Sequence, residues 1–159
     1  MGYRIPAFEL RPYMNVVELA KTRVMPLTGQ PYSFDMTPYF EEPCRFLDDV
    51  ASTCRVVISA PSQSGKSEIM LNFVAHIAIY DPAPSLLIMD TSNNSYKFSS
   101  GRVKPLLRDF VKLPAFDDTS ISNRNDDKKK AVSEYSLSNN SPLYIGGSVS
   151  LSDLCSKPC

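Results

Sequence analysis

The segment from Val56 to Glu68 constrains this chain most, because a short β-branched apolar run leads directly into a Gly-Lys-Ser sequence. Its spacing fits the phosphate-binding pattern G-x-x-x-x-G-K-[ST], with Ala60 in place of the first glycine. A helical pattern follows, with Ile69 and Phe73 on one apolar face. The segment therefore predicts a strand, a phosphate-binding loop and a helix.

Each part of a bound nucleotide's phosphate chain has a candidate partner in this loop. The backbone N–H groups expected around the phosphates belong to Ser62, Gln63 and Ser64. Gly65 lets the backbone approach closely, Lys66 supplies an ammonium for the β- and γ-phosphates, and the Ser67 hydroxyl is a candidate Mg²⁺ ligand. The helix start adds a favourable dipole. We expect ATP and Mg²⁺ as cofactors; the alternative is a Gly/Ser-rich turn without a ligand.

Composition excludes several classes of protein. The 159 residues, 43% of them hydrophobic, suffice for one compact domain. Basic and acidic residues balance at 17 each, so any contact with DNA must be local. No apolar run is long enough to span a membrane and the N-terminus does not resemble a signal peptide, so we expect a soluble intracellular protein. Four cysteines without paired spacing are expected as thiols: Cys44, Cys54, Cys155 and Cys159. A metal site is an alternative for Cys155 and Cys159.

The first half of the chain is expected to form an arm followed by an α/β body. Residues 1–30 are the arm, with a short helix near Met14 to Lys21, and residues 31–159 are the body. Thr37 and Pro38 indicate a capped helix start, with the helix running to about Val50. The loop helix should end near Tyr80. The apolar run 85–89 then predicts a buried parallel strand, which completes a βαβ unit.

The second half alternates polar and apolar segments. A helical pattern covers about residues 95–110, with an interruption at Pro105. Residues 117–130 read as an exposed charged loop. Residues 131–137 and 142–145 predict two strands, and residues 150–154 predict a short helical turn.

A carboxylate that completes the magnesium shell of an ATPase is hard to find. Asp90 follows an apolar run, but that run begins only about 20 residues after Lys66, and Thr91 rather than an acid comes next. We interpret Asp90 as a strand-end or helix-capping residue, with a metal-holding role as the alternative.

Several ordered motifs together resemble the lambda-type (GpA-like) large terminase subunit of tailed phages, over about residues 14–159. The motifs are Tyr32 to Tyr39, the loop from Ala60 to Glu68, Asn72, Asp81-Pro82, the strand ending in Thr91, Ser99 with Arg102, Pro105 to Asp109, Gly146-Gly147-Ser148 and Ser152 to Pro158. Only the phosphate-binding loop is specific alone.

The resemblance implies a P-loop NTPase of the α/β class, with a central mostly parallel sheet flanked by helices. It implies the ATP-binding part of a DNA-packaging motor, which in the intact protein couples ATP hydrolysis to DNA translocation into the procapsid. The implied partners are double-stranded DNA, the small terminase subunit, the portal protein and further copies of the chain, in the host cytoplasm. In the family, a Walker B strand ending in Asp-Glu and a nuclease domain follow. We therefore expect a fragment truncated before the Walker B strand and inactive alone.

The resemblance also bears on residues outside the loop. Some large terminases carry an arginine within the loop, where this chain has Ser62 and Gln63, so the candidate catalytic arginine beside Lys66 is Arg102 or an arginine from a neighbouring subunit. The alternative for Arg102 is a surface ion pair with a helix carboxylate. Tyr39 could stack on adenine or belong to the core. His76 is expected to be structural, and the lysines at 128–130 to be a solvated run rather than a DNA contact.

Two other functions stay open. One is another P-loop enzyme, such as a helicase-like ATPase or a small-molecule kinase, although a kinase lid would need arginines and residues 117–130 offer only Arg124. The other is a nucleotide-binding module without turnover.

Overall fold

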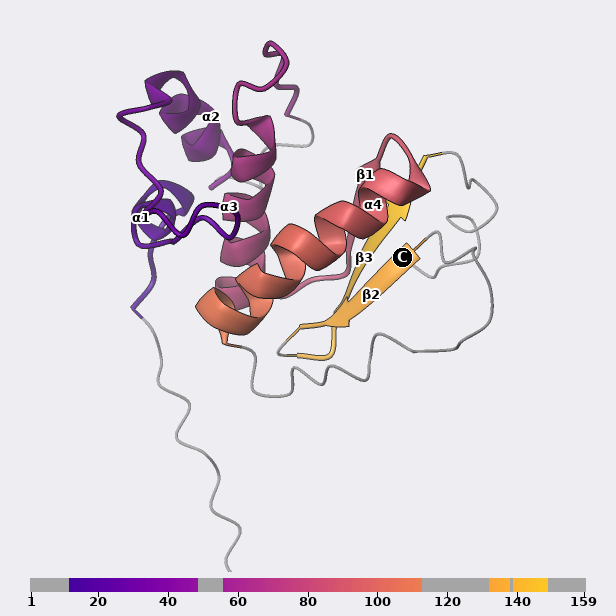
Figure 1. The fold of residues 1–159 in the computed structure, drawn as a ribbon. Helices are drawn as coiled ribbons and strands as arrows, with labels where there is room; N and C mark the ends of the chain where they lie inside the picture. The colour runs from indigo at the N-terminus through magenta and orange to yellow at the C-terminus, as the bar shows by residue number, and fades with distance from the viewer. Residues whose placement is uncertain (1–11, 49–55, 113–131, 138, 149–159) are drawn as a thin grey trace, which may run out of the picture.

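A computed structural model describes residues 12–48, 56–112, 132–137 and 139–148. The helices are α1 (Val16–Lys21), η1 (Pro38–Phe40), α2 (Glu41–Phe46), α3 (Lys66–Tyr80), α4 (Ser92–Phe98), η2 (Ser99–Val103) and η3 (Leu106–Val111); the strands are β1 (Ser85–Met89), β2 (Val132–Ser136) and β3 (Pro142–Gly147). Helices α1, α2 and α3 form one group, and the long helix that begins with α4 lies across the sheet (Figure 1). No helix in these ranges is both long and apolar enough to cross a membrane.

The first helix forms where the sequence predicts it. The Asn15 side chain accepts a hydrogen bond from the Glu18 backbone, and the Glu18 side chain accepts one from the Asn15 backbone. This reciprocal capping satisfies N–H groups that a helix start leaves unpaired. The buried Val16 and Leu19 hold α1 against the rest of the molecule.

The helix expected from Thr37 to about Val50 is shorter and starts differently. Residues 38–40 form a 3₁₀ turn, α2 ends at Phe46, and the Thr37 side chain makes no capping hydrogen bond. Thr37 therefore does not cap the helix as predicted, because a 3₁₀ turn with Pro38 at its start precedes α2. Pro43 is tolerated in the first turn of α2, where its missing N–H would have no partner within the helix.

The sheet has the order β1-β3-β2. β1 and β3 are parallel, with Leu87 opposite Ile145, whereas β2 and β3 are antiparallel. The short connection between β2 and β3 permits only an antiparallel pair, because a parallel pair needs a long crossover. In the described residues the sheet is therefore mixed rather than mostly parallel. β1 forms over residues 85–89, as predicted.

The predicted strand at residues 56–58 does not pair with this sheet. Residues 56–60 are outside any helix or strand, and the Val57 side chain is 83% exposed. Ile58 and Ala60 pack partly against the core between α1, α2 and α3. A strand needs a neighbour to satisfy its backbone groups, and none of the described strands lies beside this segment. The βαβ unit is thus represented here only by α3 and β1.

The long helix after β1 starts at Ser92, earlier than predicted. Its second half is π-helical on both sides of Lys104 and Pro105. Proline removes a backbone donor and crowds the preceding turn, and a wider helical turn accommodates that change. The interruption expected at Pro105 is therefore a local widening, not a break.

Two apolar cores meet at α3. One contains Leu71, Leu107 and Ile145 and joins α3 to the long helix and the sheet. The other contains Val16, Phe40 and Ile69 and joins α3 to α1, η1 and α2. Each fully buried aliphatic side chain contributes roughly 1.5–3 kcal/mol to stability. α3, which begins directly after the predicted phosphate-binding loop, is thus held from both sides. The predicted charged loop at 117–130 and the turn at 150–154 lie outside the described residues.

Candidate nucleotide-binding site

The loop before α3 has the backbone shape of an anion-binding site. Gln63 (φ 59°) and Gly65 (φ 95°) are both left-handed, and Gly65 directly precedes the first residue of α3. Alternation of right-handed and left-handed residues turns successive N–H groups toward one concave side. The Ser64 hydroxyl donates to the Pro61 carbonyl at 2.8 Å, which closes the loop on itself. The loop is therefore preformed at the N-terminus of a 15-residue helix.

Lys66 is the first residue of α3, and its side chain lies back along the loop. Its ammonium donates to the carbonyl oxygen of Ala60 at 2.6 Å and also to that of Pro61. Ser67 follows in the first turn and is partly exposed. The ammonium therefore lies against the loop, and Ser67 follows it at the start of the helix, in the order that the phosphate-binding pattern requires.

Tyr39 lies beside the same loop. Its hydroxyl donates to the Ser64 carbonyl at 3.3 Å, and its side chain remains 58% exposed. The neighbouring Phe40 is buried and lies 3.5 Å from the position that a Cβ on Gly65 would take. Phe40 is thus the core residue of this turn, and the Tyr39 ring packs against it at 4.5 Å between ring centres while remaining the more exposed of the two.

Glu68 links the phosphate-binding helix to two other parts of the chain. Its carboxylate accepts a hydrogen bond of 2.7 Å from Arg23 and one of 3.4 Å from Arg102. Arg23 also donates through Nε to the Asn72 side chain at 2.7 Å. Arg102 therefore forms an ion pair with a helix carboxylate, the alternative that the sequence left open.

Asp90 supports the start of α4. Its carboxylate accepts hydrogen bonds from the backbone N–H of Thr91 and from the Asn94 side chain, at 2.8–2.9 Å. Thr91 is the N-cap and accepts from the Asn94 backbone. The interpretation of Asp90 as a strand-end residue that helps a helix begin is confirmed.

His76 is structural, as predicted. Its Nε2 lies 3.2 Å from the Met14 carbonyl oxygen, and its ring contacts Tyr13 and Tyr80. Burial lowers the pKa of the imidazole below its ordinary value, and weaker attraction from Asp48 opposes that shift. His76 has no nucleophile beside it among the described residues and takes no part in the site.

Arg23 is the residue near this site that sequence reasoning missed. A signal was present, since beyond Lys66 and Ser67 the apolar pattern of α3 is interrupted by polar residues at the helical spacing Glu68, Asn72 and His76. Such a stripe on a buried helix requires polar partners. The partners come from the N-terminal segment: Arg23 for the first two and the Met14 carbonyl for the third.

Comparison with known protein families bears directly on this geometry. The family model described as phage terminase large subunit gpA, ATPase domain, matches residues 28–157. The chain belongs to this family. The resemblance inferred from the ordered motifs is thereby confirmed. No curated protein and no solved structure matches the chain.

In this terminase ATPase domain the matched residues include the loop at 60–67, Tyr39, Glu68 and Arg102. Arg23 lies before the matched range, yet it makes the shortest contact to Glu68. Among the described residues, no group of three or more His, Cys, Asp or Glu side chains could hold a metal ion.

Proposed function

We propose that the chain binds MgATP at the loop of residues 60–67 and serves as the ATPase part of a phage DNA-packaging motor. The observation that carries the proposal is the preformed loop, with left-handed Gln63 and Gly65 followed by Lys66 and Ser67 at the start of α3. The family assignment supports the same activity.

Each residue of the loop has a distinct task in this proposal. The N–H groups of Ser62, Gln63 and Ser64 bind phosphate oxygens, and Gly65 keeps the approach open. The Lys66 ammonium exchanges its two backbone carbonyl partners for β- and γ-phosphate oxygens. The Ser67 hydroxyl would hold Mg²⁺, which neutralises charge on the phosphates when bound.

The adenine base is assigned to Tyr39. Its exposed ring and its hydrogen bond to the Ser64 carbonyl keep it beside the loop. Base-aromatic stacking needs only an open π-face, which Tyr39 offers and the buried Phe40 does not.

We assign Arg102 the role of neutralising the negative charge that develops on the γ-phosphate in the transition state. It lies in the π-helical segment η2, with its side chain 29% exposed, and its contact to Glu68 is the longer of the two arginine contacts. Glu68 remains paired with Arg23 if Arg102 moves away. Arg102 can therefore leave Glu68 without depriving a partly buried carboxylate of its partner.

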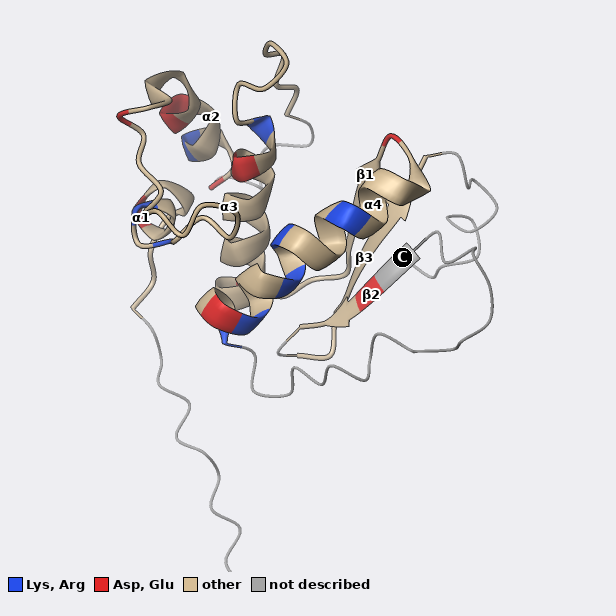
Figure 2. Cartoon of the chain, in the orientation of Figure 1, with Lys and Arg blue, Asp and Glu red and all other residues tan. Residues whose placement is uncertain are grey.

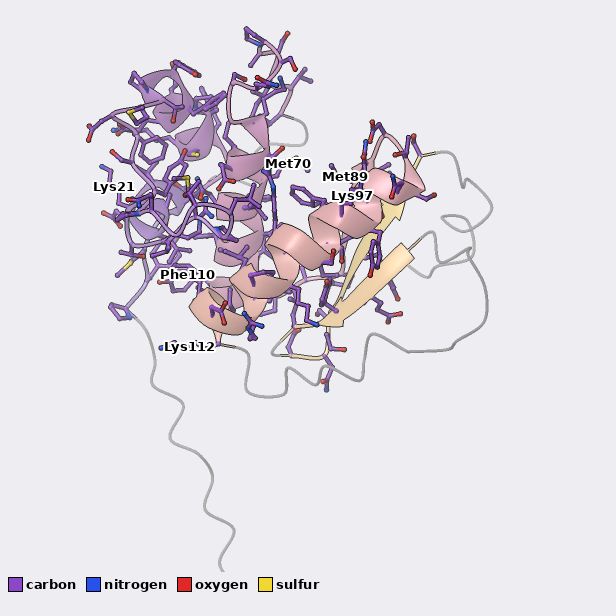
Figure 3. The ribbon with its side chains drawn as sticks, in the orientation of Figure 1. Lys21, Met70, Met89, Lys97, Phe110 and Lys112 are labelled. Atoms are coloured by element: carbon purple, nitrogen blue, oxygen red, sulfur yellow. The ribbon has the colours of Figure 1, made fainter. Side chains whose placement is uncertain are left out.

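The long helix after β1 is the assigned contact to double-stranded DNA. Residues 92–112 contain one acid, Asp109, and five basic residues: Lys97, Arg102, Lys104, Arg108 and Lys112. Basic residues recur along the ribbon of this helix, with the labelled Lys97 and Lys112 toward its opposite ends (Figures 2 and 3). Because the chain as a whole has no net charge, this local excess is the feature that favours a phosphate backbone.

The remaining partners follow from the family alone. We assign the small terminase subunit, the portal protein and further copies of this chain as partners, in the host cytoplasm. A helicase-like ATPase or a nucleotide-binding module without turnover stays the alternative. ATP hydrolysis that increases with duplex DNA in the presence of the small subunit and the portal protein would favour the motor.

Thermal unfolding with and without MgADP tests the binding step. A ligand that binds only the folded chain at about 100 times its Kd adds about 2.7 kcal/mol to the free energy of unfolding. We expect MgADP to raise the midpoint for the wild type and to leave the Ser67→Ala variant less affected at the same concentration. An unchanged wild-type midpoint at millimolar MgADP would argue against nucleotide binding.

A further inference from the structure

Arg23 is a buried cation with an unusual set of contacts. It is 1% exposed and lies two residues after α1, in the segment before the first predicted body helix. Nη2 donates to Glu68 at 2.7 Å, Nε donates to Asn72 at 2.7 Å, and the guanidinium lies 5.1 Å from the centre of the Tyr32 ring. Arg23 thus bridges two successive turns of α3 at the end that carries the phosphate-binding loop.

Stability alone does not account for this arrangement. One nitrogen of the buried guanidinium, Arg23 Nη1, has no hydrogen-bond partner among the described residues. Replacing a buried ion pair by apolar side chains of similar volume often leaves the stability of a protein unchanged or raises it. A buried arginine with an unpaired nitrogen at this place therefore calls for a role beyond packing.

That role is indicated by the position of Glu68 in the first turn of α3. Glu68 follows Ser67 directly, and its carboxylate is only 15% exposed. Whatever holds the Glu68 carboxylate also limits how the first helical turn can rotate or fray. We propose that Arg23 is a positioning residue for the nucleotide site, which acts through Glu68 to fix the Lys66 ammonium and the Ser67 hydroxyl. This inference rests on the proposed function of the loop.

Arg23 rather than Arg102 is assigned this task for two reasons. Its contact to Glu68 is 2.7 Å against 3.4 Å for Arg102, and its side chain is fully buried whereas that of Arg102 is partly exposed. Arg23 also has a second anchor at Asn72, one turn further along α3. A planar guanidinium with several donors can hold two acceptors at once, which a lysine ammonium on a flexible stem does less well.

The experiment compares MgADP affinity and thermal stability in the full chain and its variants. Arg23→Met removes the charge and keeps most of the volume, and Arg45→Met is the matched control. Arg45 forms an exposed ion pair with Glu41 on α2, away from the loop helix. Calorimetry is run at a temperature where circular dichroism shows every variant folded.

We expect Arg23→Met to bind MgADP about tenfold more weakly than the wild type, the lower end of the 10–100-fold loss that removal of an outer-shell partner causes at metal sites. Arg45→Met should bind as the wild type does. Arg23→Lys should recover part of the affinity. A lower midpoint for Arg23→Met with unchanged affinity would show a purely structural role and overturn the inference.

A second variant keeps the inference testable if Arg23→Met does not fold. Glu68→Gln keeps the shape of the side chain but removes the charge that Arg23 holds, so we expect a similar loss of affinity. Unchanged affinity in Glu68→Gln would contradict the inference. If the wild type itself does not bind MgADP, the proposed function fails; if it binds and neither variant is weaker, only the role of Arg23 fails.

Discussion

The ammonium of Lys66 donates a 2.6 Å hydrogen bond to the carbonyl oxygen of Ala60, so the loop supplies a partner for its own lysine. This contact keeps the side chain beside the loop rather than extended into solvent. A phosphate that enters replaces a neutral carbonyl as the partner of the ammonium, and the attraction between opposite charges then adds to the hydrogen bond. The Lys66 ammonium is therefore held by the loop in the absence of ligand and should still bind a phosphate in preference to the Ala60 carbonyl.

A substitution of Gly147, at the end of β3, tests the packing between the sheet and the start of α4. A Cβ at this position would lie 2.3 Å from the Ser92 backbone nitrogen, and backbone cannot move aside as a side chain can. We expect Gly147→Ala to lower the free energy of unfolding by about 2–3 kcal/mol. Urea unfolding gives the measurement.

The control for Gly147 is Gly101→Ala. Gly101 lies in η2, and no atom of another part of the chain lies within 4 Å of the position that its Cβ would take. Alanine is favoured over glycine in helices by about 0.5–1 kcal/mol, so this variant should be as stable as the wild type or more so. Equal stability of the two variants would mean that β3 does not approach α4 as described.

Substitutions of Tyr39 distinguish binding of the adenine base from binding of the phosphates. We expect Tyr39→Ala to weaken ATP binding by about 1–3 kcal/mol, the usual contribution of base-aromatic stacking, and to leave binding of magnesium pyrophosphate unchanged. Tyr39→Phe keeps the ring and should bind ATP nearly as well as the wild type. Equal losses for ATP and pyrophosphate in Tyr39→Ala would assign Tyr39 to the loop conformation instead of the base.

His76 gives the chain a pH-dependent stability. Its folded pKa is lowered by burial, so the unfolded chain binds the proton more readily. The contribution of neutral His76 is therefore fully present above its ordinary pKa of about 6.5 and is lost as the pH falls through the folded pKa. Urea midpoints measured at about pH 7.5 and about pH 5.5 should differ more in the wild type than in His76→Gln. The same pH difference in both proteins would contradict a buried neutral imidazole.

The basic face of the long helix predicts weak, salt-dependent DNA binding. The chain alone should bind duplex DNA with a Kd of about 10⁻⁴–10⁻⁶ M and no sequence preference. Replacing Lys97 and Lys112 together by alanine should lower the slope of log K against log salt by about 2, because each phosphate contact contributes about one unit. Lys21 on α1 is the matched control, and Lys21→Ala should leave the slope unchanged. Nanomolar, sequence-selective binding would contradict this account.

Much of the site could be predicted because its chemistry is local. The Gly-Lys-Ser sequence, the helix to Tyr80 and the apolar strand at 85–89 all depend on neighbours in the sequence, and the structure has each of them. Asp90 could also be interpreted locally, since a strand-end acid beside Thr91 suits a helix start.

What could not be predicted depends on distant partners. Residues 56–58 have the composition of a strand, but strand pairing is decided by a neighbouring backbone, and none of the described strands lies beside them. Arg23 lies in the segment predicted as an N-terminal arm. Its partners Glu68 and Asn72 are 45 and 49 residues further along the chain, so nothing within its own segment indicates them. The polar stripe on α3 is the clue that was present in the sequence.

Titration calorimetry of MgADP into the wild-type chain and into Lys66→Ala tests the central claim most directly. Hydrogen bonds to charged groups contribute about 1.5–3 kcal/mol, so the account predicts measurable binding by the wild type and an affinity roughly 10- to 100-fold lower for Lys66→Ala. Lys104→Ala, which changes a lysine outside the loop, should bind MgADP as the wild type does. Equal affinity of the wild type and Lys66→Ala would contradict the assignment of this loop as the nucleotide site.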